Sequence, residues 1–94
     1  MAERKEIIRR RLVLYGWVQG VGLRYRARHA AERFGCTGWV HNEYDGSVTL
    51  ELQGSREAVD EVLMSLERGA YVRIENLERV DLPVEPQERG FHIH

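Results

Sequence analysis

The sequence predicts an α+β fold, with two helices on one face of a sheet whose neighbouring strands are mostly antiparallel. Short apolar runs typical of strands alternate with two segments in which apolar residues recur at helical spacing. An Asp-Gly pair, which is usual in hairpin turns, separates two of the strand-like runs. The 94 residues are enough for one small domain, so we expect a single domain over residues 1–94.

The first third of the chain predicts a strand followed by a helix. The apolar run within residues 7–15 is ended by Gly16 and is typical of a mostly buried strand. A helix is expected to begin near Leu23 and to end at Gly35, since glycine is common just beyond a helix C-terminus. The apolar residues in this segment share one helical face: Leu23, Ala27, Ala30, Ala31 and Phe34.

A hairpin and a second helix come next. Residues 37–41 and 47–53 flank the Asp45-Gly46 pair, and the second of these runs alternates apolar and polar side chains, as a strand with one buried face does. Ser55 is a good N-cap for a helix that should end near Gly69. Its apolar face consists of Ala58, Val59, Val62, Leu63 and Leu66.

Two further strands are predicted over residues 72–80 and, after a linker with two prolines, over residues 91–94. The resulting order is βαββαβ with a short extra C-terminal strand, which is the ferredoxin-like sandwich. A right-handed crossover makes the first two strands parallel, with the third antiparallel between them. The glycine-rich segment after the first strand should therefore lie beside Asn42, at the end of the second.

This glycine-rich segment carries the strongest functional signal. Residues 15–28 read YGWVQGVGLRYRAR, and no acidic residue occurs from Ile7 to Ala31, although the net charge of the chain is -1. Glycines in a strand-to-helix connection let backbone N–H groups point inward, and the helix N-terminus adds unpaired donors. The pattern favours a phosphate site clamped by the guanidinium of Arg24. The alternative is a tight turn whose glycines supply positive φ angles, with solvated arginines beside it.

Two common phosphate-binding motifs are excluded. A P-loop requires a Lys-Ser/Thr pair after the glycines, and none follows here. The spacing of GWVQGVG also differs from the dinucleotide fingerprint, and the strand order is not that of a doubly wound sheet.

Residues 16–24, GWVQGVGLR, resemble the signature loop of the acylphosphatase family, Gly-x-Val-Gln-Gly-Val-x-Phe-Arg. The second family signature is matched by GWVHN at 38–42 and by DGSV at 45–48, and the resemblance covers nearly the whole chain. Leu23 stands where the family usually has Phe. Leucine is the smaller apolar residue, and we expect this position to lie in the core.

The resemblance implies an enzyme that hydrolyses the carboxyl–phosphate bond of small acyl phosphates and releases inorganic phosphate, with no metal or other cofactor. It implies that Asn42 positions the attacking water and that Arg24 binds the phosphoryl group. The loop would contribute backbone amides from the following residues: Gly16, Gln19, Gly20, Val21, Gly22 and Leu23. The family also implies a monomer.

Other arginines and aromatic residues have simpler interpretations. We expect Arg26 and Arg28 to be solvated helix charges. Arg9 to Arg11 are expected to lie exposed on the first strand, where they can steer anions. Trp17 and Trp39 either border the acyl group or serve in packing.

The remaining chemically notable residues are interpreted structurally. Cys36 is alone, so no internal disulfide is possible, and we expect a semi-buried, unreactive thiol. Two histidines on the last strand, His92 and His94, are not a metal site without a third ligand. Asp45 is assigned to turn chemistry. With no apolar signal-peptide core and no membrane-length apolar run, a cytoplasmic protein without membrane association is expected.

Two rival functions are considered. The first is a catalytically silent regulatory domain that binds phosphate or carbamoyl phosphate; the chain length and the retained Arg24 and Asn42 favour the enzyme instead. The second is an RNA-binding module of the same fold class, which would stack bases on aromatics of its central strands. Residues 46–53 contain no aromatic side chain, so we expect no nucleic-acid binding.

Overall fold

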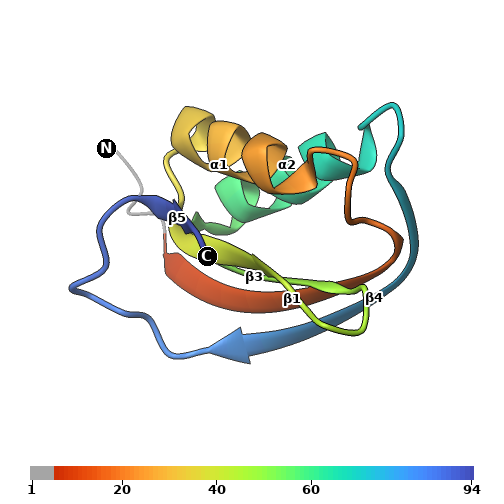
Figure 1. The fold of residues 1–94 in the computed structure, drawn as a ribbon. Coiled ribbons are helices and arrows are strands. Elements are labelled where there is room, and N and C mark those ends of the chain that lie inside the picture. The colour runs from red at the N-terminus through yellow and green to blue at the C-terminus, as the bar shows by residue number, and fades with distance from the viewer. Residues whose placement is uncertain (1–5) are drawn as a thin grey trace.

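The computed structural model describes residues 6–94, whose strands form one sheet with both helices on the same face (Figure 1). Residues 1–5 of the predicted domain lie outside the described residues. In chain order the elements are β1 (Ile7–Trp17), α1 (Leu23–Phe34), β2 (Thr37–Asn42), β3 (Val48–Ser55), α2 (Arg56–Glu67), β4 (Arg73–Leu82) and β5 (Phe91–Ile93). Within the described residues, neither helix is long and apolar enough to cross a membrane.

The sheet has the order β4-β1-β3-β2-β5. β3 pairs antiparallel with β1 and with β2, β4 pairs antiparallel with β1, and β5 joins β2 in parallel. The predicted ferredoxin-like α+β fold is therefore confirmed, including the placement of the third strand between the first two.

Most helix ends lie where the sequence places them. Gly35 has a φ of 76° after α1, and its N–H donates to the carbonyl of Ala31. Ser55 caps α2 by accepting a hydrogen bond of 3.1 Å from the N–H of Ala58. β1 extends beyond its predicted end, because the chain bulges between Tyr15 and Gly16 and then continues its pairing with β4.

Two glycines, each preceding a tryptophan, mark close approaches between neighbouring strands. Gly16 has a φ of 124°, and a Cβ there would lie 2.3 Å from the carbonyl oxygen of Arg73. Gly38 has a φ of 141°, and its Cβ would lie 1.8 Å from the carbonyl oxygen of Glu51. Both positions require glycine for its backbone conformation and for its lack of a side chain.

The apolar core fills the space between the sheet and the two helices. Leu23 is 2% exposed, so its expected core position is confirmed. The other fully buried large side chains come from the strands, from α2 and from the β1–α1 loop: Leu12, Leu14, Val18, Val40, Val48, Leu50, Leu52, Val59, Val62 and Leu66. This core holds the ends of β1 and β2 in fixed positions, and the two connections that form the site begin there.

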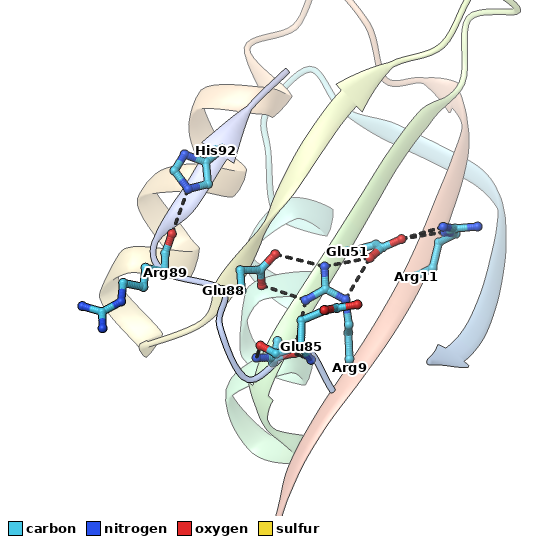
Figure 2. A network of polar contacts seen from close by, with 8 residues as sticks. Arg9, Arg11, Glu51, Glu85, Glu88, Arg89 and His92 are labelled. Carbon is cyan, nitrogen blue, oxygen red and sulfur yellow. Dashed lines mark hydrogen bonds and ion pairs between the residues drawn. The ribbon is translucent and has the colours of Figure 1, made fainter. Parts of the chain in front are cut away.

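The opposite face of the sheet carries a buried polar cluster near the start of β1 (Figure 2). The guanidinium of Arg9 donates to Glu51 at 2.8 Å and to Gln53 at 3.2 Å. It also forms two hydrogen bonds, of 2.7 and 3.0 Å, with the carboxylate of Glu88. Glu88 belongs to the segment that leads from β4 to β5 across the end of the sheet (Figure 1).

The expectation that the three consecutive arginines of β1 lie exposed is wrong for two of them. Arg9 is 4% exposed and Arg10 is 6% exposed. Arg10 pairs with Asp81 of β4 at 3.0 Å and with Asp60 of α2 at 3.7 Å. Both arginines are buried because carboxylates from elements distant in the sequence surround them. They therefore hold the fold together, and they lie at the opposite end of β1 from the glycine loop.

Candidate active site

The glycine loop after β1 and the turn between β2 and β3 meet at one end of the sheet (Figure 1). A pocket of about 210 Å³ lies between the loop and Asn42. This volume is far above the ~10–15 Å³ needed for one water molecule, so an anion and a water can enter together. Its lining residues are Val18, Gly20, Gly22, Leu23, Arg24, Tyr25 and Asn42.

Gly20 and Gly22 shape the loop through their backbone conformation. Their φ angles are 73° and 76°, in the left-handed region that favours glycine. A Cβ at either position would meet nothing within 4 Å, so the requirement is for the backbone angle and not for space. The two left-handed residues turn the chain tightly from the end of β1 into the first turn of α1.

The N-terminus of α1 differs from that of α2 in a way that suits an anion. Gly22 is its N-cap and supplies no side-chain hydrogen bond, and its first turn contains no acidic residue. At α2, Ser55 accepts a hydrogen bond from a first-turn N–H, and Glu57 adds a negative charge. Helix N-termini carry unpaired N–H donors and a positive dipole end. In α1, these unpaired N–H donors and the positive dipole end are available to an anion in the pocket.

Arg24 lies in the first turn of α1 and lines the pocket. Its side chain forms no ion pair with any residue of the described part of the chain. This contrasts with Arg9 and Arg10, whose charges are satisfied by carboxylates. A pocket-lining guanidinium without an acidic partner can bind two oxygens of a phosphoryl group at once.

Asn42 is the last residue of β2 and lines the same pocket, so its predicted proximity to the loop is confirmed. Its Oδ1 is buried, and no residue among 6–94 donates a hydrogen bond to it. Leaving a buried acceptor unpaired costs about 1–3 kcal/mol. Such a group at a pocket wall is suited to accept a hydrogen bond from a bound water.

The other predicted loop residues are placed differently. Gly16 lies within β1 against β4, and neither it nor Val21 lines the pocket. Gln19 does not line the pocket either, and its side-chain amide donates to the carbonyls of Glu43 and Ser47. Of the predicted loop residues, Gly20, Gly22 and Leu23 therefore line the pocket.

Sequence reasoning missed two pocket residues, Val18 and Tyr25. Val18 could have been found from its place as the first valine of the Gly-x-Val-Gln-Gly signature. Tyr25 is 64% exposed at the pocket and also stacks with Arg28, whose guanidinium carbon lies 5.8 Å from the centre of the ring. Arg26 donates to the carbonyl of Ser65 at 2.8 Å, so it joins α1 to α2.

The two tryptophans lie in different settings. Trp17, at the end of β1 just before the pocket residue Val18, is 69% exposed. Trp39 packs edge-on against the ring of His94, at 5.8 Å between ring centres. Trp39 therefore serves in packing, whereas Trp17 lines a different pocket, together with Tyr71 and Arg73.

Asp45 lies in the turn, as expected, whereas Cys36 is more deeply buried than expected, at 4% exposed. Asp45 accepts hydrogen bonds from the N–H and the hydroxyl of Ser47, and these bonds lower its pKa. Burial raises the pKa of the Cys36 thiol to about 11, so the thiol is unreactive. His92 contacts the carbonyl oxygen of Arg89 at 2.8 Å. Within residues 6–94, no three His, Cys, Asp or Glu side chains are arranged to hold a metal.

Comparisons with known proteins agree with this arrangement. The sequence matches the family described as Acylphosphatase over residues 10–93. The acylphosphatase of Bifidobacterium longum is 39% identical over 85 residues, which cover 89% of this chain and 88% of the relative. That of Rhizobium etli is 38% identical over 94 residues, 99% and 98% of the two chains. The crystal structure of acylphosphatase from Bacillus subtilis matches with a TM-score of 0.85 at 25% identity, covering 93% of this chain and 98% of that one.

Proposed function

The chain belongs to the acylphosphatase family, hydrolases of acyl phosphates, and on that premise we propose that Arg24 and Asn42 carry the reaction in the pocket at the N-terminus of α1. The substrate is a small acyl phosphate, and the products are a carboxylate and inorganic phosphate. The observation that carries this proposal is the meeting, in one pocket, of an arginine and a buried amide oxygen for which residues 6–94 supply no acidic partner and no donor, respectively.

Arg24 and the backbone amides bind the phosphoryl group. The N–H groups at the start of α1, reached through Gly20 and Gly22, donate to the phosphoryl oxygens, and the guanidinium neutralises their charge. Charge on these oxygens changes as the bond to the leaving carboxylate breaks, so donors already in place stabilise the transition state.

Asn42 orients the water. Its Oδ1 accepts a hydrogen bond from the water and directs the water oxygen toward phosphorus. An amide is not basic, so the proton passes to a phosphoryl oxygen of the substrate. The new bond joins the water oxygen to phosphorus, the bond from phosphorus to the carboxylate oxygen breaks, and the carboxylate leaves with that electron pair. The carboxylate is a good leaving group, so the reaction is expected to need no metal ion.

The test is hydrolysis of benzoyl phosphate in the presence of a chelator, with the wild type compared with Arg24→Ala and Asn42→Ala. Removing one transition-state donor typically lowers the rate ~10²–10³-fold, which we expect for kcat/KM of Arg24→Ala. Asn42→Ala should lower kcat with little change in KM, because it acts on the water and not on substrate binding. Arg33→Ala is the matched control, since it removes the same charge from the other end of α1. Equal losses in Arg24→Ala and Arg33→Ala would contradict the proposal.

The silent regulatory domain is separated from the enzyme by the same experiment. Inorganic phosphate at 100 times its dissociation constant should raise the free energy of unfolding by about 2.7 kcal/mol in either case. Turnover is expected from the enzyme alone. The proposal includes a monomer in the cytoplasm, supported by a single, buried cysteine, and sedimentation of the purified protein tests the monomer.

A further inference from the structure

Gln19 connects the two halves of the pocket. Its side-chain Nε2 donates a hydrogen bond of 2.7 Å to the carbonyl oxygen of Glu43 and one of 2.8 Å to the carbonyl oxygen of Ser47. Gln19 lies between the pocket residues Val18 and Gly20, and Glu43 directly follows Asn42. The side chain therefore spans from the phosphate-binding loop to the turn that carries the water-orienting residue.

The orientation of this amide follows from its partners. Both partners are carbonyl oxygens, which accept hydrogen bonds and cannot donate them. The NH₂ group must therefore face the turn, and both of its hydrogens are used. The carbonyl of Ser47 also accepts from the N–H of Glu43 at 2.8 Å, so Gln19 joins a turn that is already closed on itself.

The connection matters because the sheet does not supply it. β1 and β2 are separated by β3, and the pairing of β1 with β3 ends at Leu14 and Val48, before the loop begins. In the described part of the chain, the two bonds of Gln19 are the hydrogen bonds that join residues 18–22 to residues 43–47. Without them, no direct hydrogen bond would join the described loop residues to the turn, and Asn42 would be held beside the loop only indirectly, through the pairing of β2 and β1 with β3 and through packing.

We propose that Gln19 is a positioning residue, which fixes Asn42 at the distance from the bound phosphoryl group that attack by water requires. This inference rests on the proposed function of Asn42 and adds a residue that does not touch the substrate with its side chain. Catalytic groups displaced by about 1 Å can lose ~10²-fold in rate, so loss of this connection should reduce kcat more than binding.

The first experiment measures kcat, KM and inhibition by inorganic phosphate for Gln19→Ala, Asn42→Ala and the double variant. Gln19→Ala should lower kcat ~10- to 100-fold, while KM and the phosphate inhibition constant change by no more than about twofold. The double variant should have the kcat of Asn42→Ala, because Gln19 acts through Asn42. Tyr44→Ala, at the fully exposed tip of the same turn, is the control and should leave kcat within about twofold of the wild type.

The second experiment uses Gln19→Glu, which keeps the size of the side chain. An ionised carboxylate has no hydrogen to donate and would face two carbonyl oxygens, whereas a protonated carboxyl donates one hydrogen bond. The ratio of variant to wild-type kcat should therefore rise as pH falls and the introduced carboxyl becomes protonated. A role confined to folding would change thermal stability without giving this pH profile of kcat.

The possible outcomes separate this inference from the proposed function. No turnover in the wild type refutes the proposed function and this inference with it. Turnover in the wild type with an unchanged kcat in Gln19→Ala refutes this inference alone, as do additive losses in the double variant. If Gln19→Ala does not fold, the pH profile of Gln19→Glu tests the inference in its place. A ratio of variant to wild-type kcat that does not change with pH overturns the inference.

Discussion

Truncation of Glu88 to alanine should reveal how much the buried polar cluster contributes to stability. The side chain of Arg9 is 4% exposed and that of Glu88 is 16% exposed, and two short hydrogen bonds join them. Removing one partner of a buried ion pair typically costs about 3–5 kcal/mol. Arg9 keeps its bonds to Glu51, so its charge remains paired, and we expect the lower value of about 3 kcal/mol. For a domain of this size, that lowers Tm by about 12–24 °C.

The assay is urea unfolding at pH 7, followed by circular dichroism, with Glu85→Ala as the matched control. Glu85 lies in the same segment as Glu88, but its contacts with Gln53 are made by its backbone N–H and carbonyl, which alanine retains. The control should therefore stay within about 0.5 kcal/mol of the wild type. Equal destabilisation by both variants, or a loss below about 1 kcal/mol in Glu88→Ala, would refute the reasoning.

The same pair of proteins tests the pH dependence of the cluster. Burial raises the pKa of Glu88, but Arg9, together with Thr37 and His92, lowers it by more, so the pKa lies below its ordinary value of 4.5. A carboxyl with a lowered pKa in the folded state stabilises the protein above its unfolded-state pKa, and this stabilisation is lost as pH falls through the folded-state value. The difference in unfolding free energy between wild type and Glu88→Ala should therefore shrink below about pH 4.5. If the difference in unfolding free energy stayed constant down to pH 3, the ion pair between Glu88 and Arg9 would not be the source of the stability.

Two further predictions concern a glycine and the cysteine. Gly38→Ala should prevent folding or cost more than about 4 kcal/mol, because its Cβ would overlap the carbonyl oxygen of Glu51, whereas Gly46→Ala has open space and should cost only about 1–3 kcal/mol of backbone strain. Soluble yield and thermal unfolding measure the stability of both variants. A Gly38→Ala protein as stable as Gly46→Ala would contradict the predicted overlap at Gly38. Cys36 should react slowly with a thiol reagent at pH 8 and rapidly in urea, since burial raises its pKa to about 11; fast reaction of the folded protein would show that the thiol is exposed.

The fold was predictable because its signals are local. The helical period from Leu23 to Phe34, the capping residues Gly35 and Ser55, and the alternation within β3 each depend on neighbours in the chain. The handedness of the crossover then places Asn42 beside the glycine loop. The extension of β1 through Gly16 was missed, because a glycine after an apolar run indicates a turn more often than a bulge.

The side-chain partners were not predictable in the same way. The local pattern predicts an exposed basic run at residues 9–11, yet Arg9 and Arg10 are buried. The decisive partner of Arg9 is Glu88, 79 positions away, and it comes from a segment without regular structure. Nothing in the local pattern of either residue indicates that contact.

The sequence by itself determined the order of elements, the ferredoxin-like class, the family and the position of the glycine loop, because periodicity, glycine positions and motif spacing are properties of short stretches of chain. Only the tertiary structure decided which loop residues line the pocket, that no described residue donates to Oδ1 of Asn42, and that the side chain of Gln19 bonds to carbonyls 24 and 28 residues away. The physical reason is that a hydrogen bond depends on a few tenths of an ångström and on angle. Such positions are fixed only when the sheet register and the packed core bring distant segments together.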